Sequence, residues 1–135
     1  MIVKPLAGTL SDRLGRKLVI IVGLLFCVVA LPLIFRSESF AAFALMSALL
    51  GIGVGTVTPV TNALIADLAS AKRLGAAMGV FGTVFDFGEG MGPIVAGFLI
   101  GSLGYAVTFD VLAAMTLAAT VLLMFVVREP GASAR

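Results

Sequence analysis

The amino-acid sequence predicts an all-α, polytopic membrane protein with four transmembrane helices. Hydrophobic residues make up 61% of the 135 residues and charged residues only 12%, and the mean hydropathy is +1.21. The apolar residues form four long runs, none of which alternates with the period of two expected of a strand in a membrane barrel. Helices are therefore the structure in which these runs can satisfy their backbone hydrogen bonds within a bilayer.

Four ranges are expected to be helical, and each is close to the roughly 20 apolar residues that cross a hydrocarbon core about 30 Å thick. They are Leu18 to Phe35, Phe40 to Ala66, Gly75 to Ser102, and Tyr105 to Val127. The connections between them are short, as expected for antiparallel neighbours.

Three regions follow from this pattern. Residues 1–17 are expected to be the end of a preceding helix and a cytoplasmic loop, residues 18–127 the four-helix transmembrane region, and residues 128–135 a cytoplasmic tail. If the loop at residues 8–17 is cytoplasmic, all basic residues except Arg36 lie on the cytoplasmic side of the membrane, which is a strong positive-inside bias. The cytoplasmic set is Lys4, Arg13, Arg16, Lys17, Lys72, Arg73, Arg128 and Arg135. The expected location is the cell inner (plasma) membrane, with several passes.

The composition also excludes several classes of function. The net charge of +2 comes from basic residues at helix ends, which sets topology and does not indicate nucleic-acid binding. A single cysteine, Cys27, and the absence of histidine rule out an internal disulfide and leave no ligand set for a metal. We expect no cofactor, no metal and no enzymatic activity.

The second predicted helix combines glycines with a polar patch. Gly51 and Gly55 have the small-x-x-x-small spacing of a helix contact face. Thr58 and Asn62, four residues apart, share one face of the helix. These two side chains are either partners in interhelical hydrogen bonds or the wall of a polar cavity.

The third predicted helix contains two acids, Asp86 and Glu89, well inside the expected membrane core. Their three-residue spacing puts them on one face. A carboxylate at the centre of a membrane helix costs about 2.5 to 3.5 kcal/mol on insertion scales, and two on one face repel each other. The pair is therefore a candidate proton-binding unit; the alternative is that each is hydrogen-bonded to a neighbouring helix or lines an aqueous cavity and does not titrate.

One compact charged loop precedes the first predicted helix and has an ordered spacing: Gly8-x-x-x-Asp12-Arg13-x-Gly15-Arg16-Lys17. It resembles the G-x-L-x-D-R-x-G-R-K motif that the major facilitator superfamily has between the second and third helices of each six-helix half. The resemblance implies a gating loop. Asp12 would be the latch acid, Arg13 and Arg16 its supports, and Gly8 and Gly15 the packing points.

A second pattern lies in the third predicted helix, where Gly88, Gly92, Pro93 and Gly97 stand in the order G-x-x-x-G-P-x-x-A-G. It is similar to the G-x-x-x-G-P-x-x-G-G motif of drug:proton antiporters of that superfamily, with Ala96 in place of one glycine. Bare backbone at the glycines would allow close packing, and Pro93 would bend the helix.

The resemblance covers nearly the whole chain and implies helices nine to twelve of a major facilitator transporter, with helices three to six as the alternative register. It predicts a partial major facilitator fold from a proton-coupled efflux transporter. The implied partners are membrane lipid, a small-molecule substrate, protons as coupling ion, and the missing helices of the full transporter, with no nucleic acid.

Two other classes of function are compatible with the sequence. Four helices with a membrane glutamate could form a small self-assembling multidrug exporter, although Glu89 would then lie in the third span and the loop motif would have no role. The chain could also be a non-transporting membrane scaffold or a truncated product.

Overall fold

The structure, a computed structural model, describes residues 15–127 and contains three helices in this part of the chain. They are α2 (Arg16–Arg36), α3 (Phe40–Leu68) and α4 (Leu74–Val126). Each is long and apolar enough to cross a membrane. The first two predicted ranges agree with α2 and α3 to within a few residues.

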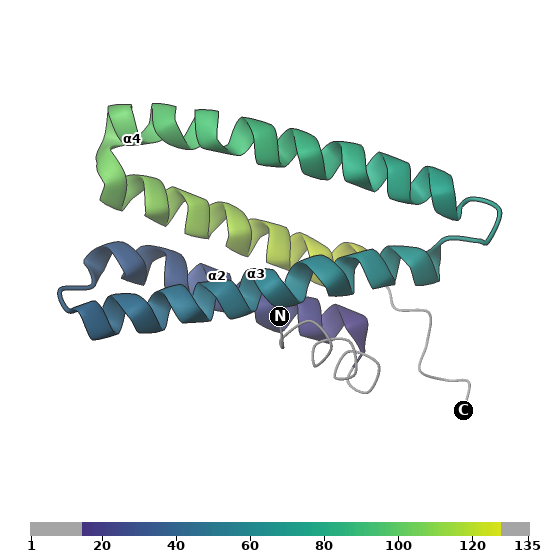
Figure 1. The fold of residues 1–135 in the computed structure, drawn as a ribbon, viewed down its shortest axis with the longest axis horizontal. Coiled ribbons are helices and arrows are strands. Elements are labelled where there is room, and N and C mark those ends of the chain that lie inside the picture. The colour runs from purple at the N-terminus through teal and green to yellow at the C-terminus, as the bar shows by residue number, and fades with distance from the viewer. Residues whose placement is uncertain (1–14, 128–135) are drawn as a thin grey trace.

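Helix α4 covers both of the remaining predicted ranges, and non-helical backbone at Gly104 divides it into two helical stretches across a kink. The chain reverses direction at this kink (Figure 1). The reversal occurs at Gly104, where φ is 79° and ψ is 168°, a conformation that is essentially restricted to glycine. We call residues 74–103 the first limb of α4 and residues 105–126 the second limb.

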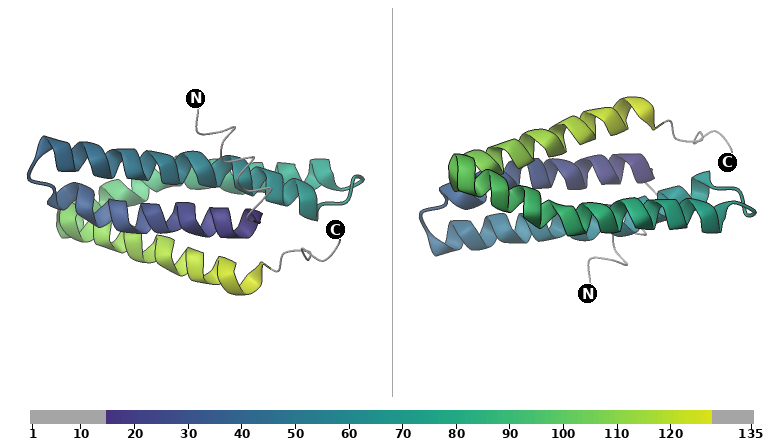
Figure 2. Two further views of the ribbon diagram at one scale, coloured as in Figure 1. Left: turned by 90° about the horizontal axis from the view of Figure 1, so that it is seen from below. Right: turned by 90° about the horizontal axis from the view of Figure 1, so that it is seen from above.

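Helix α2 lies between α3 and the second limb of α4 (Figure 2). The buried core at this junction consists of Val19 and Ile20 of α2 and Val60 and Leu64 of α3. Leu123, near the end of the second limb, packs against the same cluster. These three segments therefore share one core, although the second limb is far from α2 in the sequence.

Helices α2 and α3 pack closely against each other at Gly23 and Gly53. A Cβ atom built on Gly53 would lie 2.7 Å from both the Cys27 Sγ and the Gly23 carbonyl oxygen, so only a glycine fits there. The expectation that Gly51 and Gly55 form the contact face is wrong for this part of the chain, since a Cβ on either would meet no atom within 4 Å. Gly53 lies on the opposite side of α3 from these two, and that side is the one that faces α2.

At the end of the molecule opposite the loop motif, α2 is joined to the second limb by an ion pair and by stacked rings. Arg36 donates to both carboxylate oxygens of Asp110 at 2.7 Å. Phe35 stacks on Tyr105 and Phe109, with ring centroids 5.8 and 6.3 Å apart. The sequence places aromatic residues at this end, and the structure shows which of them meet.

Residues of the first limb of α4 are less buried by the described chain than residues of the second limb. All three buried residues of α4, namely Thr108, Ala113 and Thr120, belong to the second limb. Phe98 on the first limb is 76% exposed and Val80 is 67% exposed. The limb approaches α3 near the connecting loop and then diverges from it (Figure 1).

Candidate functional site

The loop motif is described from Gly15 onward, and Gly8, Asp12 and Arg13 lie outside the described residues. Gly15 precedes α2 with a φ of 92°, a left-handed value that favours glycine over any residue with a Cβ. This conformation sets the direction in which α2 leaves the loop.

The two basic residues after Gly15 contact the ends of two other helices. The Arg16 guanidinium forms a 2.7 Å ion pair with Asp67, in the last turn of α3. The Lys17 ammonium donates a 2.7 Å hydrogen bond to the carbonyl oxygen of Met124, in the last turn of α4. A cation is favourable at both positions, because the carbonyl end of a helix has a partial negative charge. These contacts hold the ends of α2, α3 and the second limb together.

Thr58 and Asn62 of α3 line a cavity of about 170 Å³ together with residues of the first limb of α4. The lining residues from the first limb are Met78, Phe81, Gly82 and Phe85. The Thr58 hydroxyl donates to the Val54 carbonyl of its own helix at 3.2 Å. In the part of the chain that is described, Thr58 and Asn62 both line this cavity, and neither makes a hydrogen bond to another helix.

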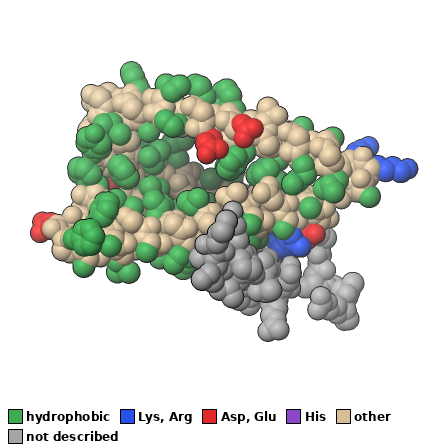
Figure 3. Space-filling model, viewed as in Figure 1, with side chains coloured by type: hydrophobic (Ala, Val, Ile, Leu, Met, Phe, Trp, Pro, Cys, Tyr) green, Lys and Arg blue, Asp and Glu red, His purple; other side chains and the backbone are tan. Residues whose placement is uncertain are grey.

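The two acids are exposed on the first limb, about midway along it. Figure 3 shows two acidic side chains on the upper limb, near the edge of a hollow in this face of the molecule. The lining residues Met78, Gly82 and Phe85 recur at heptad spacing, and Glu89 follows four residues after Phe85. Glu89 therefore lies on the same helix face as these cavity-lining residues, closer to the middle of the first limb. Among residues 15–127, neither Asp86 nor Glu89 forms an ion pair or a hydrogen bond.

The glycine-proline pattern of Gly88, Gly92, Pro93 and Gly97 lies within the helical part of the first limb. A Cβ on any of the three glycines would meet no atom of the described chain within 4 Å. The close packing expected from this pattern is thus not made by α2, by α3 or by the second limb.

Three features of the site region were not predicted. The ion pair of Arg36 with Asp110 joins residues 74 positions apart, and no local pattern connects them. The contact of Gly23 with Gly53 could have been suspected from the small residues at Gly23, Cys27 and Ala30 of α2. The apolar lining of the cavity has a clear signal in hindsight, because Met78, Phe85 and their neighbours repeat with a helical period that ends at Glu89. Within the described residues, no group of His, Cys, Asp and Glu side chains is placed to hold a metal ion.

A helical protein with several apolar spans, a cavity between two of them and carboxylates at mid-helix belongs to the class of polytopic membrane proteins. A family model described as Major Facilitator Superfamily matches residues 1–135. The chain therefore belongs to the major facilitator superfamily, whose members are transporters.

Comparison with curated proteins gives relatives of this family. The chain is 31% identical over 105 residues to the "Multidrug transporter protein MdtP" of Bacillus subtilis (strain 168). The matched region covers 78% of this chain and 19% of that protein. It is 27% identical over 133 residues to the "Quinolone resistance protein NorA" of Staphylococcus aureus. That matched region covers 98% of this chain and 34% of the relative. The chain thus spans about a third or less of the length of these relatives. No solved structure matches it significantly.

Proposed function

We propose that this chain is a fragment of a proton-coupled major facilitator transporter that exports a small molecule from the cell. The observation that carries the proposal is the cavity between Thr58 and Asn62 of α3 and the first limb of α4, whose face continues to Glu89. A polar wall, an aromatic wall and a carboxylate near mid-membrane are suited to an amphipathic substrate and an exchanged proton.

The proposed topology has four crossings, with α2 and α3 making one each and the limbs of α4 making two. A straight helix of 53 residues would be about 80 Å long, far more than a core of about 30 Å, whereas each limb is long enough for one crossing. The ends near Lys17, Asp67 and Met124 lie together, which is consistent with a common cytoplasmic side. Lys72 and Arg73, in the loop before α4, add positive charge to that side.

Asp86 and Glu89 are the proposed proton-binding pair. Two carboxylates one turn apart in a membrane helix are unfavourable when both are charged, and binding a proton removes one charge and the repulsion between them. Thr58 and Asn62 are the proposed substrate-facing polar residues.

Further helices of the major facilitator fold are needed for transport in this proposal. Two observations support this: the relatives are about three or more times longer than the matched region, and the first limb of α4 has large exposed apolar side chains and unpacked glycines. Gly88, Gly92, Pro93 and Gly97 would pack against those helices. Asp12, supported by Arg13 and Arg16, would be the latch acid at the cytoplasmic end of one of them, with Gly8 and Gly15 as packing points.

The proton-binding pair is tested with the protein in the form in which its cells produce it. Inverted membrane vesicles are prepared from those cells, and a pH gradient is imposed across the vesicle membrane. A fluorescent quinolone is the first probe, because the relative NorA is named a quinolone resistance protein. We expect the double variant Asp86→Asn, Glu89→Gln to lose gradient-driven accumulation of the probe. Asp86→Glu and Glu89→Asp, which keep a titratable carboxyl group, should retain part of it. Undiminished accumulation by the double variant would overturn the assignment of the pair.

The need for further helices has its own test. The 135-residue chain is purified, reconstituted into liposomes and assayed for probe transport under the same gradient. We expect no transport above that of empty liposomes, and robust transport by this chain alone would contradict the fragment proposal.

A further inference from the structure

The cavity of about 170 Å³ between α3 and the first limb of α4 has one position in its wall without a side chain. The residues of the first limb that line it are Met78, Phe81, Gly82 and Phe85. Gly82 follows Met78 by four residues and precedes Phe85 by three, so it lies between them on the same helix face. The middle of this wall is therefore bare backbone.

Neither packing nor backbone conformation within the described chain requires a glycine at position 82. Gly53 is required in α3 because a Cβ there would lie 2.7 Å from the Cys27 Sγ, whereas a Cβ on Gly82 would meet no atom within 4 Å. The glycines with positive φ in the described part of the chain are Gly15 and Gly104. Alanine would be the better helix former at position 82. The glycine therefore leaves open space in the cavity at a cost to the helix.

Two aromatic rings border the open space at Gly82. The ring centroids of Phe81 and Phe85 are 6.0 Å apart and the ring planes are tilted by 36°, a contact that restrains both rings on one side of the cavity. Thr58 and Asn62 of α3 form the opposite side. A cavity of roughly 150 Å³ accepts one benzene ring. The present cavity therefore has room for a single ring between the aromatic pair and the two polar side chains.

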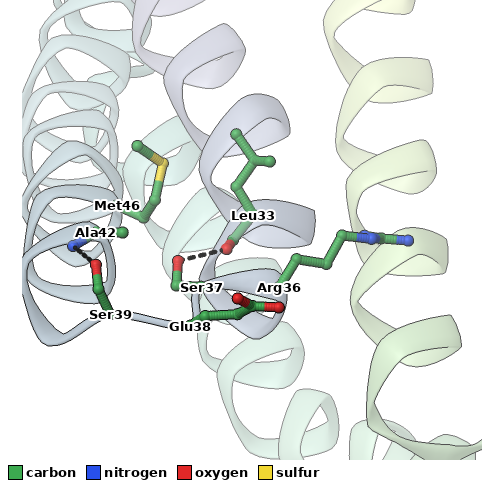
Figure 4. A pocket seen from close by; sticks show the side chains of 7 residues that line it. All are labelled: Leu33, Arg36, Ser37, Glu38, Ser39, Ala42 and Met46. Carbon is green, nitrogen blue, oxygen red and sulfur yellow. Dashed lines mark hydrogen bonds between the residues drawn. The ribbon is translucent and has the colours of Figure 1, made fainter.

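The groove of about 520 Å³ at the turn between α2 and α3 differs in how its polar side chains are used (Figure 4). The Ser37 hydroxyl donates to the Leu33 carbonyl at 2.7 Å, and the Ser39 hydroxyl accepts from the Ala42 amide at 3.2 Å. These two serines therefore cap helix ends. The Asn62 side chain, in contrast, makes no hydrogen bond to any described residue and is available to a molecule in the smaller cavity.

We propose that Gly82 sets the size limit of the substrate in this cavity. The substrate class is a compound whose flat aromatic ring lies against Phe81 and Phe85 and whose ring substituent occupies the space at Gly82. The inference rests on the proposed function, because it assigns a specificity-determining residue to the same transport site. A side chain at position 82 would fill this space, so it would exclude compounds with a bulky substituent more strongly than compounds with a small one.

The test compares two fluorescent quinolones that differ only in the substituent on the quinolone ring nitrogen, which is methyl in one and benzyl in the other. Each is offered to inverted membrane vesicles with an imposed pH gradient, and the ratio of the initial accumulation rates, benzyl over methyl, is measured. We expect Gly82→Leu to lower this ratio about tenfold, because even one methylene group in a hydrophobic pocket changes discrimination by about 10- to 200-fold. Gly82→Ala should lower it less. An equal loss of both compounds in Gly82→Leu, or an unchanged ratio, would overturn the proposal.

Gly79→Leu is the matched control. A Cβ on Gly79 would also meet no atom of the described chain within 4 Å, but Gly79 does not line the cavity. The ratio should therefore stay at the value of the unmodified protein, and a tenfold decrease would count against the assignment to Gly82. Adding Met78→Ala to Gly82→Leu returns space to the same wall and should raise the ratio again. A ratio that does not recover would contradict a loss caused by filled space.

A binding measurement separates this inference from the proposed function. The fluorescence anisotropy of each quinolone is titrated with the purified protein in detergent, where no pH gradient exists. If neither compound is transported, weaker binding of the benzyl compound alone to Gly82→Leu would contradict the transport proposal and leave the size limit standing. Equal loss of binding of the two compounds, or no binding of either to the unmodified protein, would overturn the size limit as well.

Discussion

The ammonium of Lys17, at the start of α2, donates a 2.7 Å hydrogen bond to the carbonyl oxygen of Met124, 107 residues further along the chain. Met124 is in the last turn of α4, where carbonyls have no amide partner within the helix. The charged loop motif thus caps a helix of its own chain, in addition to any role in gating.

Removing this cap should destabilise the protein. Replacing Lys17 by Met deletes the charge and the donor, and we expect a loss of about 0.3 to 1 kcal/mol in the free energy of unfolding. Unfolding in mixed detergent micelles measures it. Lys17→Arg keeps a cation at this position and serves as the control, and equal stability of Lys17→Met and the unmodified protein would show that the hydrogen bond contributes nothing.

The contact of α2 with α3 predicts a position-specific effect of a single methyl group. Gly53→Ala places a Cβ 2.7 Å from the Cys27 Sγ and from the Gly23 carbonyl oxygen, so the helices must separate, and we expect a loss of about 1 to 3 kcal/mol. Gly51→Ala is the matched control, two residues away with no atom within 4 Å. It should be neutral or slightly stabilising, because alanine favours a helix. Similar effects of the two changes on unfolding would refute this geometry.

The ion pair of Arg36 with Asp110 predicts a charge-reversal rescue. Arg36→Asp and Asp110→Arg should each lower the unfolding temperature at low salt, since each juxtaposes like charges at the end of α2. The double reversal should recover most of the loss. Because both side chains are exposed, the single-variant effects should shrink in about 1 M salt, where charges are screened within about 3 Å. Thermal unfolding at two salt concentrations distinguishes this from a purely steric effect, which salt would leave unchanged.

The reversal in α4 depends on one backbone conformation. Gly104→Ala forces a side chain into a φ of 79° and a ψ of 168°, and we expect a loss of about 1 to 3 kcal/mol. Gly101→Ala, one turn earlier in ordinary helical backbone, is the control. Chemical unfolding of the two variants side by side gives the comparison, and an unaffected Gly104→Ala would mean that the chain reverses differently.

The approximate ranges of the helices and the family of the protein could be predicted from the sequence. Long apolar runs such as Phe40 to Ala66 become helices because a bilayer leaves the backbone no other way to satisfy its hydrogen bonds, which makes a local pattern decisive. The spacing of Thr58 with Asn62, and of Asp86 with Glu89, likewise followed from the period of the helix alone. The reversal at the single residue Gly104 was not predicted, because glycine is equally compatible with a longer loop and with a one-residue reversal.

Only the tertiary structure decided which faces meet. Gly53, and not Gly51 or Gly55, contacts α2, because the rotation of α3 about its axis is fixed by packing against Val19 and Ile20 and not by glycine spacing. Lys17 with Met124 and Arg36 with Asp110 join residues distant in the sequence, and pairings of this kind depend on how the helices are arranged around α2. The sequence alone determined what can lie in a membrane and which residues are chemically able to act; the tertiary structure decided which of them lie together, since contacts between helices depend on their relative rotation and depth, which no local pattern contains.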